Sequence, residues 1–187
     1  MFAVACMGIA IGAIAGEKPS EPPALALDAQ PLVYTRDGAT QGCGVRLTGG
    51  EPGGEGPSAW FDFSFAVFRR GIALAQSIAY EIRRSETGES RPALRPVQST
   101  WIAAWEGRVR RGENDERRDT LVYRLVLDDA VALFQAVAHG QPLRLGIRPW
   151  GQRNESVYTG TTALTEESRT RIGECLAALT SEGQRAP

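Results

Sequence analysis

Apolar and polar side chains alternate over much of this chain, which is the pattern of half-buried β-strands. The clearest case is the segment 61–67, whose odd positions are all apolar: Phe61, Phe63, Phe65 and Val67. After Arg70-Gly71 the alternation resumes over residues 72–82. There one face carries small or polar side chains, and the other carries the larger ones of Ile72, Leu74, Ile78, Tyr80 and Ile82. Because a period of two places alternate residues on opposite faces, we predict a long β-hairpin over 61–82.

Three further hairpins are predicted from similar patterns. The strand segments that they join are 31–36 with 43–47, 97–106 with 120–127, and 143–147 with 156–162. Asp37-Gly38 lies between the first two segments and is a dipeptide typical of tight hairpin turns. The tip of the middle hairpin, residues 107–119, carries many charges of both signs and is interpreted as a solvated end. The segments 49–57 and 85–96 are rich in glycine, proline or polar residues and are predicted to be loops.

Two helices are expected in the second half of the chain. The first follows Asp128-Asp129 and covers residues 130–138, where an apolar stripe is formed by Val131, Phe134 and Val137. The second begins after Thr165, a good N-terminal cap, and its apolar residues recur at intervals of three and four: Ile172, Cys175, Leu176 and Leu179. Cys175 is therefore expected to point toward the sheet.

Short connections between the strands favour antiparallel pairing over the crossovers of a nucleotide-binding fold. The predicted fold is α+β, with a mainly antiparallel sheet of about eight strands that forms a sandwich or a half-open barrel. Its two helices include a C-terminal one that packs on the sheet. We assign a single β-rich domain to residues 31–180 and a disordered tail to 181–187.

The first segment has the pattern of a signal peptide. Residues 2–16 are apolar or small and include Ala13-Ile14-Ala15, an A-x-A cleavage pattern. We expect residues 1–15 to be removed and residues 16–30, which contain three prolines, to be a flexible tether. No Lys or Arg precedes the apolar run, so a start codon further upstream is one alternative. A lipoprotein with its lipid on Cys6 and a buried N-terminal helix are the others.

Signal cleavage would remove Cys6 and leave two cysteines, Cys43 and Cys175. In an oxidising compartment such a pair usually bonds, so we predict a disulfide in a periplasmic or secreted protein. The bond would close a long loop, and the chain-entropy model gives it about 5 kcal/mol of stabilisation. Two separate buried thiols are the alternative.

Charge excludes two classes of partner. The formal net charge is -1, from 21 basic and 22 acidic residues, which provides no field that would attract nucleic acid or an anionic membrane. After signal cleavage no membrane span is expected. All basic residues except Lys18 are arginines, and with 21 glycines in the chain we interpret this bias as the codon usage of a GC-rich bacterial genome.

No catalytic residue, cofactor or metal site is predicted. The chain has one histidine, His139, and lacks the motifs of serine hydrolases, metalloproteases, phosphate-binding loops and dinucleotide-binding folds. The remaining catalytic alternative is a cell-envelope hydrolase that uses paired carboxylates. Its candidate acids lie near strand ends: Glu106, Asp119, Asp128 and Asp62.

A binding function has more support, because Trp and Arg are enriched at binding hot spots. The candidate patch lies on the face opposite Leu143, Leu145 and Ile147, and consists of Arg144, Arg148, Trp150, Arg153 and Tyr158. A weaker candidate is the pair Trp101 and Trp105, because large aromatic residues at even spacing are more often core residues than a binding surface. We therefore expect a non-enzymatic domain that binds an envelope protein or a small ligand through an exposed sheet face.

Overall fold

The fold is taken from a computed structural model, which describes residues 22–50, 59–84 and 88–181. The first strands are β1 (Ala24–Arg36), β2 (Ala39–Gly50), β3 (Ala59–Phe68), β4 (Ile72–Arg84) and β5 (Ser90–Arg95). They are followed by β6 (Val97–Ala104), β7 (Gly112–Glu113), β8 (Thr120–Leu125), β9 (Leu143–Pro149) and β10 (Ser156–Thr161). The two helices are α1 (Leu127–Ala138) and α2 (Glu166–Ser181).

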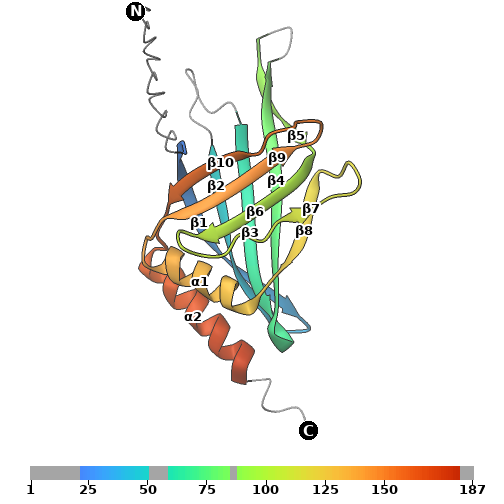
Figure 1. Cartoon of the computed structure of the whole chain (residues 1–187). Coiled ribbons are helices and arrows are strands. Elements are labelled where there is room, and N and C mark those ends of the chain that lie inside the picture. Colours follow the sequence, from blue (N-terminus) through green and yellow to red (C-terminus); the bar gives the residue numbers. More distant parts are fainter. Residues whose placement is uncertain (1–21, 51–58, 85–87, 182–187) are drawn as a thin grey trace, which may run out of the picture.

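All ten strands belong to one curled sheet. Along its main path the order is β5-β4-β3-β2-β1-β10-β9-β6-β7, and β8 pairs with β4. Every pairing is antiparallel except the short contact between β1 and β10. The sheet curls so that β10, β9 and β6 cross in front of β1 to β4, with both helices at one end (Figure 1). The predicted α+β fold with a half-open barrel is confirmed.

The first hairpin has the predicted turn but a longer first strand. Asp37 and Gly38 both adopt positive φ angles, 52° and 76°, as a two-residue hairpin turn requires. Strand β1 begins at Ala24, so residues 24–30 form a strand where a tether was predicted. The reason is an alternation that the neighbouring prolines obscured, because Leu25 is buried and Leu27 packs against the core.

The β3–β4 hairpin is confirmed, and its register explains which face of β4 is buried. Phe63 lies opposite Ser77, and Phe65 lies opposite Ala75. The large aromatic side chains of β3 therefore pack beside small ones of β4 inside the curl. The larger residues of β4 face outward, and Ile72 is 42% exposed.

The predicted hairpin of segments 97–106 and 120–127 is wrong. β8 pairs with β4, with Leu121 opposite Ser77, while β6 pairs with β9 and β7. Small side chains on β4 leave room for the leucines of β8, which is why this non-local pairing is favoured. The segment 85–96 was predicted to be a loop, but residues 90–95 form β5 on the same edge of β4.

A side chain connects the two ends of the curled sheet. The backbone N–H of Ile102 in β6 donates to the hydroxyl oxygen of Tyr123 in β8, at 3.1 Å. Burial raises the pKa of Tyr123 well above its ordinary value. The Tyr123 hydroxyl thus accepts a hydrogen bond from the backbone of β6, although β6 and β8 are not paired as strands of the sheet.

Helix α1 begins earlier than predicted and presents a different face to the core. It starts at Leu127, and its buried residues are Ala130, Leu133, Ala136 and Val137. Val131, which was predicted to be buried, is 44% exposed. The smaller alanines face the sheet and allow close packing, while the ring of Phe134 meets Phe65 edge-on at 5.0 Å.

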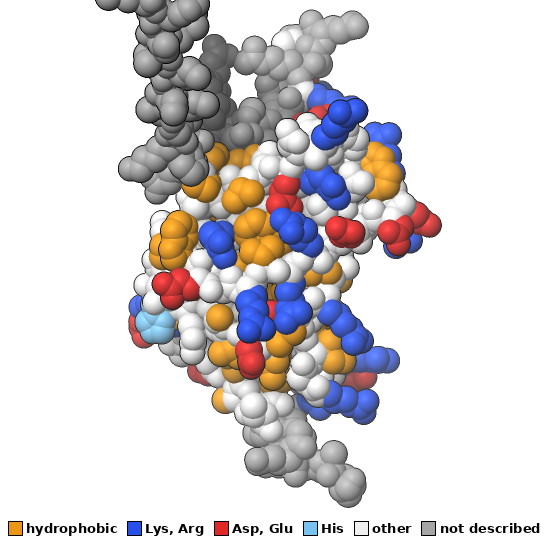
Figure 2. Space-filling model, viewed as in Figure 1, with side chains coloured by type: hydrophobic (Ala, Val, Ile, Leu, Met, Phe, Trp, Pro, Cys, Tyr) orange, Lys and Arg blue, Asp and Glu red, His pale blue; other side chains and the backbone are white. Residues whose placement is uncertain are grey.

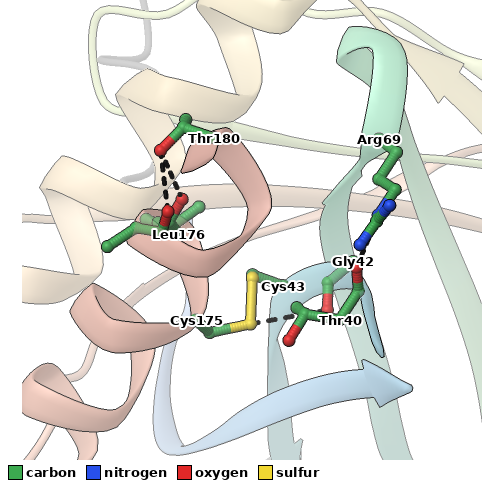
Figure 3. The surroundings of a disulfide bond; sticks show 8 residues. Thr40, Gly42, Cys43, Arg69, Cys175, Leu176 and Thr180 are labelled. Atoms are coloured by element: carbon green, nitrogen blue, oxygen red, sulfur yellow. Dashed lines mark hydrogen bonds between the residues drawn. A yellow bond between two sulfur atoms is a disulfide. The ribbon is translucent and has the colours of Figure 1, made fainter. Parts of the chain in front are cut away.

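Helix α2 and the disulfide are as predicted. The N–H of Ser168 donates to the hydroxyl of Thr165, at 3.2 Å, and Ile172, Cys175 and Leu179 are buried. The disulfide joins Cys175 to Cys43 of β2 across 132 positions, with Cα atoms 5.9 Å apart. Figure 3 shows how it ties α2 to the sheet, with the Sγ of Cys175 beside the carbonyl of Gly42.

The predicted signal peptide and C-terminal tail lie outside the described residues, apart from residue 181 at the end of α2. Within the described part, neither helix has the length and apolar content needed to cross a bilayer.

Candidate functional site

The outer face of β6 and β9 carries the candidate site. Their register places Ser99 opposite Arg148 and Trp101 opposite Gly146. Leu143, Leu145 and Ile147 are buried on the inner face. Arg144 and Arg148, which alternate with them along β9, therefore point outward, as predicted. Figure 2 shows basic, acidic and apolar side chains interleaved on the face of the molecule over β6 and β9.

Trp101 forms the apolar base of this face. Its indole lies over Gly146, and a Cβ atom at residue 146 would be only 2.0 Å from the indole Nε1. The guanidinium carbon of Arg144 lies 6.0 Å from the ring centroid, within the range of a cation–π contact. Arg144 also donates to the carbonyl oxygen of Gly107, at 2.9 Å. Trp101 is consequently only 3% exposed, and its role is to support the arginines.

Next to Trp101 lies a pocket of about 320 Å³, which we call the arginine pocket. Its lining residues come from β6, β7, β9 and the segments beside them: Ser99, Arg111, Glu113, Arg148, Arg153 and Glu155. Two residues of the predicted patch, Arg148 and Arg153, meet there. Arg144, the third arginine of the predicted patch, does not line the pocket and lies over Trp101 instead.

An internal ion pair occupies part of the pocket. Arg111 donates to both carboxylate oxygens of Glu155, from Nε at 3.3 Å and from Nη2 at 3.0 Å. Burial acts to raise the pKa of Glu155, but hydrogen bonding to Arg111 and Trp101 and the charges of Arg111 and Arg148 outweigh it. The pKa of Glu155 is therefore lowered, and the carboxylate is ionised at neutral pH.

One lining residue of the pocket and one residue next to it carry buried donors without acceptors. The Nε atom of Arg148 is buried and has no hydrogen-bond partner. The indole N–H of Trp101 is near enough to help keep Glu155 ionised, but it meets no acceptor with full hydrogen-bond geometry. Buried donors in native proteins are usually satisfied, so the unused hydrogen-bonding capacity of Arg148, which lines the pocket, favours an acceptor bound there.

Two residues of the predicted patch lie elsewhere. Tyr158 is opposite Leu145 in the β9–β10 register, so it faces the core, where its ring lies 5.1 Å from that of Phe61. Proximity along the chain had suggested the patch, but the period of the strand places Tyr158 on the other face. Trp150 is half-buried just after β9 and does not line the arginine pocket. Its backbone N–H donates to the carbonyl oxygen of Pro96, at 2.9 Å.

The other predicted candidates are separated from one another. Trp105 is 46% exposed and lies beyond the end of β6, where it lines a pocket of about 530 Å³ with Glu106. Asp62 pairs with Arg46 on the outer face of β3 and lines a different pocket, of about 400 Å³, with Trp60 and Tyr80. Two of the four candidate acids thus belong to separate pockets.

The remaining candidate acids, Asp119 and Asp128, are exposed. His139 is exposed at the C-terminus of α1, with its Nδ1 atom 2.8 Å from the carbonyl oxygen of Gln135. These contacts suit a residue that caps a helix.

Sequence reasoning missed Ser99 and three charged residues of the arginine pocket: Arg111, Glu113 and Glu155. Arg111 and Glu113 lie in the charged segment 107–119, which was interpreted as a solvated tip. Pairing of β7 with β6 brings this segment onto the outer face, with Glu113 opposite Ser99. The position of Glu155 was a usable signal. Ser156, the next residue, lies opposite Ile147 in the antiparallel β9–β10 register, and one further step along this register takes Glu155 toward Arg148.

Comparison with protein-family models, with curated proteins and with solved structures finds no match for this chain.

Proposed function

We propose that this protein is an exported, non-catalytic binding domain and that the arginine pocket is its recognition site. The observation that carries the proposal is the buried, unpartnered Nε of Arg148 beside the ion pair of Arg111 and Glu155. The Nε atom has lost water and gained no protein acceptor, and the rest of the half-buried guanidinium lines the pocket, which favours binding of an external acceptor.

The disulfide supports the exported location. Disulfides persist mainly in oxidising compartments such as the bacterial periplasm, and the bond between Cys43 and Cys175 is intramolecular. N-terminal sequencing of the protein from periplasmic extract tests this part of the proposal. A mature chain that begins at Gly16 is expected, and recovery only from the cytosol with both thiols free would contradict it.

The hydrolase alternative has less support, because the predicted acids Asp62 and Glu106 line separate pockets. Glu113 and Glu155 share the arginine pocket, but both oxygens of Glu155 are bound to Arg111. Paired-carboxylate catalysis needs two acids that flank one bond.

Loss of ligand in a pocket variant tests the binding function. The purified protein is immobilised and exposed to fractionated envelope proteins and metabolites, and the retained species are identified. We expect a species that binds the wild-type chain, is lost from the double variant Arg148→Gln/Arg153→Gln, and is retained by Trp60→Ala. Trp60 lies on β3, which β2, β1 and β10 separate from β9 in the sheet. Equal retention by all three proteins would overturn the proposed site.

A further inference from the structure

We infer that the arginine pocket binds one carboxylate group of its ligand, next to the carboxylate of Glu155. This inference rests on the proposed function and specifies the chemistry that the pocket recognises. The carboxylate can belong to a small free acid or to an acidic side chain of a protein, because the pocket opens on the outer face of the sheet.

The charge of the pocket favours a monoanion. Its lining includes three guanidinium groups and two carboxylates, so its net charge is three minus two, or +1. A carboxylate of charge −1 neutralises this charge. A phosphate group concentrates more negative charge on one centre at neutral pH and would be repelled more strongly by Glu113 and Glu155, whereas the second carboxylate of a dicarboxylic acid stays in solvent outside the pocket.

The pocket already shows how it holds a carboxylate. Arg111 binds both oxygens of Glu155 with the two-pronged geometry that guanidinium groups adopt with carboxylates. Arg148 provides a second guanidinium with a free, buried Nε. Arg153 is exposed at the rim, where its side chain can approach a ligand from solvent. Arg111 thus holds Glu155, while Arg148 and Arg153 are left for the carboxylate of the ligand.

Glu155 limits the affinity of the pocket. Its charge lies beside Arg148 and partly cancels the attraction for an incoming anion. Replacing it with glutamine would raise the net charge of the pocket to +2. We expect Glu155→Gln to bind a carboxylate about fivefold more tightly, as two partly screened charges at this range imply.

Nuclear magnetic resonance titration of the purified protein tests the inference. The probes are sodium succinate, the peptide acetyl-Gly-Glu-Gly-amide and inorganic phosphate, each added at constant ionic strength. The reporters are the Nε–H signal of Arg148 and the indole N–H signal of Trp101, which are both buried donors. Assignment uses Arg148→Gln and Trp101→Phe. We expect saturable shifts of both signals with succinate or with the peptide, and weaker binding of phosphate.

Variants with matched charge identify the residues responsible. Arg148→Gln is expected to weaken carboxylate binding at least about tenfold, while Arg171→Gln on the exposed face of α2 leaves it unchanged. Glu155→Gln is expected to strengthen binding, while Glu174→Gln, also on α2, makes the same change in net charge without effect. Both control residues are exposed.

The outcomes separate this inference from the proposed function. Tighter binding of the peptide than of succinate would identify an acidic protein segment as the ligand. Binding of succinate as tight as that of the peptide would identify a small acid. Both results support the inference. Tighter binding of phosphate, or full carboxylate affinity in Arg148→Gln, would overturn it. If neither carboxylate binds, but the double variant Arg148→Gln/Arg153→Gln still loses its envelope ligand, the carboxylate inference fails and the proposed function stands.

Discussion

Trp101 lies so close over Gly146 that any side chain at residue 146 would meet the indole, with Nε1 2.0 Å and Cε2 2.3 Å from a Cβ atom. Glycine at this position lets a large aromatic ring lie flat on the outer face of β9. The ring in turn fills the space between Arg144 and Arg148, which precede and follow Gly146 at the period of the strand. This relationship places the arginines around a rigid apolar base.

Gly146→Ala should therefore be destabilising. The contact is with a ring that is 3% exposed and has little room to move, so relief of the overlap requires a shift of the ring or of the strand. We expect a loss of about 1 to 3 kcal/mol in the free energy of unfolding, measured by chemical denaturation.

Gly173→Ala on α2 is the matched control. A Cβ atom there would meet nothing within 4 Å, and alanine is favoured over glycine inside a helix by about 0.5 to 1 kcal/mol. The control should be neutral or stabilising. A Gly146→Ala protein as stable as the wild type would show that Trp101 does not lie over this glycine.

The pKa of Glu155 should depend on Arg111. Burial acts to raise this pKa, and hydrogen bonding to Arg111 is the largest opposing contribution. In Arg111→Gln the opposing contribution is lost while most of the burial remains, so the pKa should rise from its lowered value. Titration of the carboxyl ¹³C signal of Glu155 measures the change. The same pKa in both proteins would contradict the ion pair.

Because the folded-state pKa of Glu155 is lowered, its carboxylate stabilises the folded protein above the pKa of the unfolded chain. That stabilisation is lost as the pH falls from the ordinary pKa of a glutamate, about 4.3, through the lower folded-state pKa. The difference in unfolding free energy between wild type and Glu155→Gln should thus be present at pH 7 and shrink in acid. A difference that is constant or grows below pH 4 would contradict the sign of the shift.

The strands that depend on local pattern could be predicted from the sequence. The alternation at Phe61 to Val67 and the turn at Asp37-Gly38 each determine a hairpin within a few residues of chain. The pairing of β8 with β4 could not be predicted in this way, because it joins segments separated by β5, β6 and β7. It depends on the small side chains of Ala73, Ala75 and Ser77, which leave room for the leucines of β8. The register with β3 has to be known before it is clear that these residues of β4 face the core.

Tyr123→Phe should weaken the contact between the two ends of the sheet. The hydroxyl accepts the N–H of Ile102, and its removal leaves that amide without a partner, at a cost of about 1 to 3 kcal/mol. Hydrogen exchange of the Ile102 amide should become faster. Tyr80→Phe, on the outward-facing side of β4, serves as the control and should leave this amide unchanged. Unaltered protection of Ile102 in Tyr123→Phe would show that the amide has another acceptor.

The disulfide should account for a large part of the stability. The double variant Cys43→Ala/Cys175→Ala is expected to lose up to about 5 kcal/mol of unfolding free energy, because the bond closes a long loop. Dithiothreitol should lower the midpoint of chemical denaturation for the wild type and leave that of the variant unchanged. Denaturation midpoints that do not respond to the reductant in either protein would contradict this contribution.

The binding site was only partly predictable. The outward direction of Arg144 and Arg148 followed from the period of β9, because Leu145 and Ile147 between them must face the core. Glu155 and Arg111 are 44 positions apart, and their pairing depends on how the segment before β7 returns to the outer face of β6. Local pattern carries no information on that return.

A crystal structure of the protein grown with succinate tests the central claim most directly. We predict one succinate carboxylate in the arginine pocket, with an oxygen about 3 Å from a guanidinium nitrogen of Arg148, and Glu155 still bound to Arg111. An empty pocket at a saturating concentration of succinate, or a succinate bound only at another surface, would contradict the account.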